Sequence, residues 1–348
     1  MWRQWKFQKL SCDSCVQLED LPDEVLLEIF KFLKRREILN FGQVSTRIRA
    51  ISNNESLWRK LNLFNGNVPY GFIEKAVQNG CRYLNLAHAV SNAVPDMPTL
   101  LLRNGKKVPR TKQIHCNLKY LNIEAFGQYE ELLKNCHSLQ KLSIERLSLS
   151  SEFVKHIIQN GKTLKVLDIG SGGLNPVTGP KLIQNLFKKC VELSELNFSL
   201  DFSYAGAPGR RIWFTGNAFE FKRFEKFQER ELLSAIVNNL TPEILKVDLS
   251  YDNLKDSHLM ALVKRCSKIT ELNLRGTSIT NNSVDSIAKH LDSSLEKLDV
   301  SCTKIDSTAL LRLGTVRTLK VLNCLKEEKI GRFIINCNYT GKSLSEAL

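Results

Sequence analysis

The sequence predicts an α/β protein in two parts, a small module of three helices followed by a right-handed, horseshoe-shaped solenoid. Two observations carry this prediction. Apolar residues recur at helical spacing between residues 22 and 61. From residue 81 onward, the phrase apolar-x-x-apolar-x-apolar returns many times, with amphipathic segments between the copies. Each copy predicts a short strand, and stacked copies place parallel strands on the concave face and helices on the convex face.

The three predicted helices begin at Pro22, which suits a first turn because its missing N–H is not needed there. Acidic residues follow in that turn, where negative charge favours the helix dipole. The second helix ends at Gly42. The apolar positions of the three helices are Val25, Leu26, Ile29, Phe30 and Leu33, then Ile38, Leu39 and Phe41, then Val44, Ile48, Ile51, Leu57, Trp58 and Leu61.

A module of this size cannot bury so many apolar side chains by itself, because short chains have little interior. The excess apolar surface therefore predicts a docking face. The alternative is a helical cap that covers the first repeat.

The order of residues in this module resembles the F-box. The resemblance rests on the run from Leu21 to Phe30, and on Leu33, Glu37-Ile38-Leu39, Val44-Ser45 and Leu57-Trp58. The usual basic and aromatic residues after Val44-Ser45 are replaced by Thr46 and Ile48, a departure that we expect to weaken the edge of the docking face. The resemblance implies binding to the small adaptor subunit of an SCF ubiquitin ligase. The implied contact residues are Leu21, Pro22, Val25, Ile29, Leu33 and Trp58.

Eight full copies of the repeated phrase begin at residues 118, 139, 164, 193, 244, 269, 295 and 319, and Tyr83-Leu84-Asn85-Leu86 is a truncated first copy. Their spacings are 21, 25, 29, 51, 25, 26 and 24 residues. All but one lie in or beside the period of about 20–29 residues of leucine-rich repeats, which the phrase resembles. The chain is similar to one subtype of the F-box and leucine-rich-repeat family in three short segments, Leu57-Trp58 leading to Leu61-Asn62-Leu63, Leu139–Ile144 and Ile335-Asn336-Cys337.

The third and fifth positions of each phrase are predicted to face the concave side. Together they form a polar surface of the kind that horseshoes use for partners, although any solvated sheet face is polar. The predicted substrate-binding residues on this face are Tyr120, Lys141, Asp168, Asn197, Lys246, Asp248, Asn273 and Arg275.

Two insertions interrupt the period. Residues 87–115 contain the basic run from Lys106 to Lys112, which is either a nuclear-import signal or a solvated loop. Residues 199–230 mix aromatic and basic side chains, a composition typical of interface hot spots. We expect Arg210, Arg211 and Trp213 to contact a substrate, unless this insertion only folds its aromatic residues onto the solenoid.

The predicted boundaries are a flexible tail over residues 1–15, the F-box over 16–62, and a linker with an irregular first repeat over 63–117. Leucine-rich repeats follow over 118–330, and a C-terminal tail over 331–348.

Composition limits the possible environments and partners. The longest apolar runs fall short of about 18 residues, so no membrane span is predicted. The first residues lack a secretory signal, so we expect the nucleus or the cytoplasm, and free cysteines. Cys136, Cys190 and Cys266 are predicted at buried helix ends. The net charge of +14 favours acidic, phosphorylated or nucleic-acid partners. The concave positions are not strongly basic, so we expect an acidic or phosphorylated protein rather than nucleic acid there.

We expect no catalytic residue, metal or cofactor. The six histidines lack ligand spacing, and Gly170-Ser171-Gly172-Gly173 lacks the lysine of a phosphate loop. The family resemblance implies a non-catalytic receptor that holds a protein substrate for ubiquitination and degradation and reaches cullin and RING subunits through the adaptor. The alternatives are a repeat scaffold or inhibitor outside ubiquitin chemistry, and an RNA-binding repeat protein.

Overall fold

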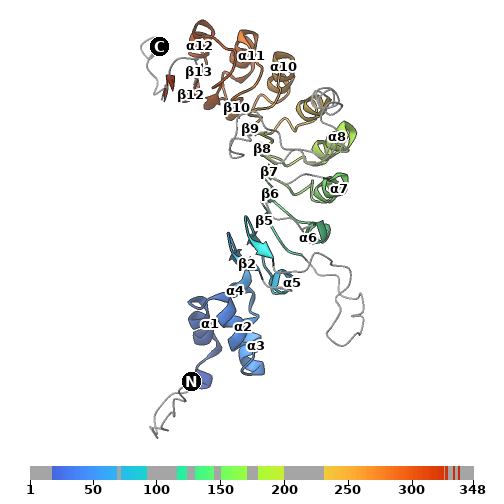
Figure 1. The fold of residues 1–348 in the computed structure, drawn as a ribbon, viewed down its shortest axis with the longest axis vertical. Coiled ribbons are helices and arrows are strands. Elements are labelled where there is room, and N and C mark those ends of the chain that lie inside the picture. Colours follow the sequence, from blue (N-terminus) through green and yellow to red (C-terminus); the bar gives the residue numbers. More distant parts are fainter. Residues whose placement is uncertain are drawn as a thin grey trace, which may run out of the picture. The chain divides into compact units, whose positions relative to one another are not determined.

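The fold is that of a computed structural model, which describes residues 18–68, 72–91, 116–123, 130–144, 150–170, 179–199 and 231–324, and the strand residues 326–327, 332–333 and 336–337. The chain divides into two compact units, residues 1–60 and residues 61–348 (Figure 1).

The first unit is helical. A 3₁₀ turn at Leu18–Asp20 precedes α1 (Asp23–Lys31), α2 (Arg35–Phe41), α3 (Thr46–Ser52) and α4 (Glu55–Trp58). The third predicted helix is therefore two helices. The division falls at Asn53-Asn54, because the Asn54 side chain accepts the backbone N–H of Ser56 at 3.0 Å and starts a new helix there.

The core of this unit contains Leu26, Phe30, Ile38 and Ile48, which are at most 2% exposed. Gly42 ends α2 with φ −60°, so no left-handed conformation requires glycine there. The close approach of α3 requires it instead, since a Cβ at residue 42 would lie 2.5 Å from Oγ of Ser52.

The second unit is built on a sheet that has eleven strands among the described residues. In it β3 and β5 to β12 run parallel, each beside the next. Its strands are β1 (Lys60–Asn62), β3 (Tyr83–Asn85), β5 (Tyr120–Asn122), β6 (Lys141–Ser143), β7 (Val166–Asp168), β8 (Glu195–Asn197), β9 (Lys246–Asp248), β10 (Glu271–Asn273), β11 (Lys297–Asp299), β12 (Val321–Asn323) and β15 (Asn336–Cys337). Every predicted phrase has become a strand, and the truncated copy is β3. This confirms the parallel α/β class.

Two small sheets accompany this main sheet. β2 (Asn67–Val68) pairs in parallel with β4 (Val90–Ser91), and β13 (Lys326–Glu327) pairs antiparallel with β14 (Arg332–Phe333). β15 pairs antiparallel with β12. The predicted C-terminal tail over residues 331–348 therefore includes strand residues.

Helices connect the strands and lie on one side of them (Figure 1). They are α5 (Phe72–Gln78), α6 (Glu130–Lys134), α7 (Ser151–Gln159), α8 (Pro180–Lys189), the helical residues 231–237, α10 (Asp256–Arg265), α11 (Asn281–Leu291) and α12 (Ser307–Leu313). Neighbouring helices pack on one another, α6 on α7, α7 on α8, α10 on α11 and α11 on α12.

The core lies between the sheet and these helices. The three apolar positions of each phrase are buried, as in the copy formed by Leu139, Leu142 and Ile144, all 0% exposed. Cys190 and Cys266 end α8 and α10 and are buried, and so is Cys136 after α6, which confirms their predicted places.

Candidate partner-binding surfaces

One face of α1 is apolar and open to solvent. Val25 and Ile29, four residues apart on this helix, are 42% and 37% exposed, while Leu26 and Phe30 fill the core. Of the other predicted contacts, Pro22 is exposed, and Leu21 and Leu33 are half-buried. Because the helix places positions i and i+4 on the same side, the structure brings Val25 and Ile29 together on an accessible surface.

Trp58 is the exception among the predicted contacts. It is 0% exposed, and its indole N–H donates to the backbone carbonyl of Ser52 at 2.7 Å. A buried indole with a satisfied N–H holds α3 and α4 together. The structure therefore places Trp58 in the core rather than on a docking face.

Two exposed apolar residues were missed as candidate contacts. Phe32 is 89% exposed and Val44 is 67% exposed. Both stand just outside a helix, where periodicity does not tell which way a side chain points. Arg47 donates to the Asp23 carboxylate at 2.6 and 2.8 Å and to the Leu21 carbonyl at 2.7 Å, which joins α3 to the start of α1.

In the second unit, the first and third residues of most repeat strands, which are the third and fifth positions of the phrase, face away from the core, while the middle residue is buried. In β6 the third residue, Ser143, is buried as well. We call this surface the open sheet face, made of the first and third residues of β5 to β12. An open groove of about 410 Å³ runs along it from Lys141 to Asn323. The face therefore consists of two rows of side chains, one for each position.

The first-position row is a ladder of alternating charge. The Lys246 ammonium lies 3.3 Å from the Glu195 carboxylate and 3.6 Å from that of Glu271, which also lies 3.1 Å from Lys297. The hydrogen bond and charge of Glu195 raise the pKa of Lys246. These groups largely neutralise one another, and because they are exposed each pair adds little stability.

At the other end of this row lie two stacked aromatic rings. Tyr83 and Tyr120 are parallel, with centroids 4.0 Å apart, and the Lys141 ammonium lies 5.5 Å from the Tyr120 centroid. Burial and a hydrogen bond with Tyr83 raise the pKa of Tyr120 to about 12, so it stays neutral. A partner at this end of the row would therefore contact the Tyr120 ring and the Lys141 ammonium together.

The third-position row carries the turns that follow the strands. Oδ1 of Asn197, Asp248 and Asn273 each accepts the backbone N–H two residues on, at 3.0, 2.9 and 3.1 Å. Asp168 makes the same contact with Gly170 at 3.4 Å. Such side-chain turns stabilise a chain reversal. The predicted substrate-binding residues of this row thus have a structural role.

The same side chains are also linked across strands. The Asn273 amide donates to the second oxygen of Asp248 at 2.8 Å, and Ser143 donates to Asp168 at 3.3 Å. A partner at the third-position row must therefore use donors and acceptors that these turn and cross-strand hydrogen bonds leave open.

Arg275 follows β10 and is held in place by Tyr251. Its Nε donates to the Tyr251 hydroxyl at 2.7 Å. Tyr251 has φ 62°, and its ring packs so closely on Gly276, at φ 69°, that a Cβ there would lie 2.6 Å from the ring. A half-buried guanidinium held in this way can donate hydrogen bonds to a carboxylate or phosphate.

The remaining predicted contacts, Arg210, Arg211 and Trp213, lie outside the described residues, as does the basic run from Lys106 to Lys112. Within the described ranges, no group of three or more His, Cys, Asp or Glu side chains could hold a metal ion. No helix among these residues is long and apolar enough to cross a membrane.

The comparison with protein families decides the nature of the N-terminal unit, because residues 18–63 match the family described as F-box-like. The N-terminal unit is an F-box-like domain. The match covers α1 to α4 and β1 and includes the exposed face of α1. This match supports the assignment of the chain as an F-box protein and implies that it binds an SCF adaptor. It also suggests a substrate-adaptor role, and F-box proteins are generally non-catalytic adaptors.

Proposed function

We propose that this protein is the substrate-recognition subunit of an SCF-type ubiquitin ligase. The observation that carries the proposal is the F-box-like match at residues 18–63, together with the solvent-exposed Val25 and Ile29 on α1. These residues, with Leu21, Pro22 and Leu33, contact the adaptor, which leads to the cullin and RING subunits. The protein contributes proximity rather than chemistry, since it raises the effective concentration of substrate lysines near the conjugating enzyme.

The second unit is proposed to be a right-handed leucine-rich-repeat horseshoe that holds the substrate for ubiquitination and proteasomal degradation. The short matches at Leu139–Ile144 and Ile335-Asn336-Cys337 resemble the S-phase kinase-associated F-box protein, and the chain is proposed to be of that type. It acts in the nucleus, the cytoplasm or both.

Charge on the open sheet face bears on the kind of substrate. The first-position row neutralises itself, and the third-position row includes carboxylates of Asp168, Asp248 and Asp299. An acidic or phosphorylated segment is therefore expected to use Lys141, Arg275, Arg210 and Arg211, with Trp213 as an apolar anchor, rather than the middle of the groove.

Adaptor binding tests the proposal. In calorimetry with the SCF adaptor subunit, the chain should bind, and the double change Val25→Ala, Ile29→Ala should weaken binding by about tenfold or more, since each lost apolar contact is worth on the order of 1 kcal/mol. Met260→Ala, at an apolar residue 51% exposed on α10, is the matched control and should leave affinity unchanged.

Failure of the unaltered chain to bind the adaptor would overturn the proposal. A repeat scaffold or inhibitor would then be favoured if protein partners co-purify. An RNA-binding protein would be favoured if RNA co-purifies and is released by modest added salt, as phosphate contacts are.

A further inference from the structure

Two buried thiols face each other between neighbouring repeats. The sulfur atoms of Cys116 and Cys136 are 2.9 Å apart, and the two residues are 8% and 0% exposed. Their backbones form an isolated parallel bridge, so each residue lies directly beside the other. Cys116 precedes β5, and Cys136 follows α6 and precedes β6.

This arrangement fits the geometry of a disulfide. Neighbouring strands lie about 4.8 Å apart, and disulfides join residues whose Cα atoms are about 4.4–6.8 Å apart. The two sulfurs face each other already, so a bond requires only a small approach and no change of strand register.

The two thiols are not equivalent. The hydrogen bond between the two sulfurs lowers the pKa of Cys116, whereas that contact and burial raise the pKa of Cys136. Cys116 is also the more exposed of the two. The thiolate is the reactive form of cysteine, so Cys116 is the thiol that reacts first.

We propose that Cys116 and Cys136 form an oxidation site that closes to an intramolecular disulfide with hydrogen peroxide as the two-electron oxidant. The Cys116 thiolate attacks one peroxide oxygen, the O–O bond breaks, and a sulfenic acid and hydroxide form. The Cys136 sulfur then attacks the Cys116 sulfur, the S–O bond breaks, and the thiol proton leaves with the hydroxyl group as water. Overall, two thiols and one peroxide give one disulfide and two waters, and a dithiol reductant reverses the change.

The same fold supplies internal controls. Cys190 and Cys266 are buried at helix ends, and burial raises the pKa of their thiols to about 12 and about 11. Among the residues that the structure describes, neither has a second thiol beside it. They report how fast a buried but isolated thiol of this chain is oxidised.

The test exposes the full-length, reduced protein to hydrogen peroxide, quenches it, alkylates it under denaturing conditions and maps the cysteines by mass spectrometry. We expect a peptide pair joined through Cys116 and Cys136, two hydrogens lighter than the reduced pair. It should form at least about tenfold faster than Cys190 and Cys266 lose alkylation, because a nearby thiol resolves the sulfenic acid. A dithiol should restore the reduced pair, and the oxidised protein should melt at a higher temperature.

In the Cys136→Ser variant the joined peptides should be absent, and Cys116 should accumulate a sulfenic acid that dimedone traps. If this variant does not fold, the unaltered protein still decides the question. Oxidation of Cys116 and Cys136 no faster than that of Cys190 and Cys266 would overturn the proposal, and so would conversion of Cys116 to sulfinic acid without a joined peptide.

Discussion

At the scale of single residues, a side chain that faces solvent can still make hydrogen bonds that stabilise the fold. Asp168, Asn197, Asp248 and Asn273 were predicted as contacts because they point away from the core. Their outward direction is what the structure has, but their oxygens also hold the turn after each strand. Alternation along a strand predicts which face a residue takes. It does not predict what that residue binds, because the turn that it stabilises comes from its own chain.

The structural role of the third-position row can be measured at Asn273. Asn273→Ala removes an acceptor for the Arg275 N–H and a donor to Asp248. With about 0.5–1.5 kcal/mol for each hydrogen bond, the free energy of unfolding should fall by about 1–3 kcal/mol. Urea denaturation followed by circular dichroism gives this value.

The matched control is Lys297→Ala, at a neighbouring site where the side chain makes an exposed ion pair with Glu271. It should change stability by less than about 1 kcal/mol. An unchanged stability of Asn273→Ala, combined with loss of partner binding, would show instead that Asn273 is a contact residue.

Trp58 shows the limit of the family resemblance at this scale. The motif identified its place in the chain, but a motif does not separate residues that bind a partner from those that hold the binding face. Burial makes that distinction, since Trp58 is 0% exposed and Val25 is 42% exposed.

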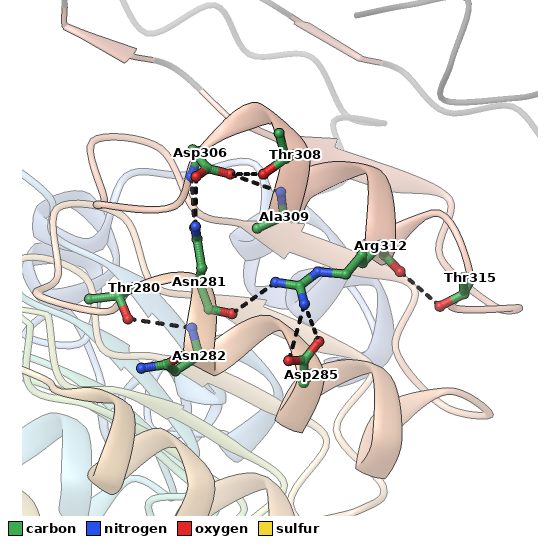
Figure 2. A network of polar contacts seen from close by, with 9 residues as sticks. All are labelled: Thr280, Asn281, Asn282, Asp285, Asp306, Thr308, Ala309, Arg312 and Thr315. Carbon is green, nitrogen blue, oxygen red and sulfur yellow. Dashed lines mark hydrogen bonds and ion pairs between the residues drawn. The ribbon is translucent and has the colours of Figure 1, made fainter.

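At the scale of elements, the helices of the second unit are joined at their first turns. Figure 2 shows Asp306, the N-cap of α12, receiving hydrogen bonds from Thr308 at 2.6 Å and the Ala309 N–H at 2.9 Å. The Asn281 amide at the start of α11 also donates to it at 2.7 Å, and Arg312 bridges to Asp285. The cap of one helix thus fixes the beginning of its neighbour.

This cap predicts a dependence of stability on pH. Bonds from Thr308, Ala309 and Asn281 lower the pKa of Asp306 from 3.8 to about 2. A carboxyl group with a lowered folded-state pKa stabilises the fold fully above its unfolded value and loses this contribution as pH falls to the folded value. The stability advantage of the unaltered protein over Asp306→Asn should therefore shrink between about pH 4 and pH 2.

Melting temperatures of the two proteins at pH 7, 4, 3 and 2 measure this effect. Asparagine keeps an oxygen that can cap α12, but it replaces the oxygen that accepts the Asn281 amide and has no carboxyl group to titrate. The variant therefore lowers stability by an amount that does not depend on this titration, and the comparison across pH measures the charge. A difference between the two proteins that stays constant from pH 7 to pH 2 would contradict the prediction.

Element boundaries were the least predictable feature at this scale. The repeated phrase predicted every strand from β5 to β12, because its apolar positions recur at nearly constant spacing. The break between α3 and α4 was missed, since it depends on one asparagine side chain. β1 was missed too, although Leu61-Asn62-Leu63 contains part of the repeated pattern.

At the scale of the whole molecule, the order of the repeat strands in the sheet could be predicted from the sequence repeat alone. Each repeat packs on the next, so the order in the sheet is the order in the chain. Helices α1 to α4 fall in the first compact unit and the strands from β3 onward in the second, which is the division that the proposed adaptor and substrate roles require. The proposed substrate contacts in residues 199–230 could not be derived from the period, because this insertion has no counterpart in the other repeats.

The division of labour can be tested by removing the first unit. A chain of residues 61–348 should capture the same proteins as the full chain from cells treated with a proteasome inhibitor, but should not retain cullin. Affinity purification with quantitative mass spectrometry compares the two. A shortened chain that folds, by circular dichroism, and captures none of these proteins would show that recognition needs both units.

The antiparallel pairing of β15 with β12 has a consequence for how the chain behaves among its own copies. A parallel sheet that simply stopped at β12 would present unpaired backbone groups, which can recruit a strand from another molecule. Asn336 and Cys337 reverse direction and lie against Asn323 and Leu322. The strand at this edge is therefore β15, which has two residues and runs antiparallel, and so short an edge is a poor template for a strand of another copy.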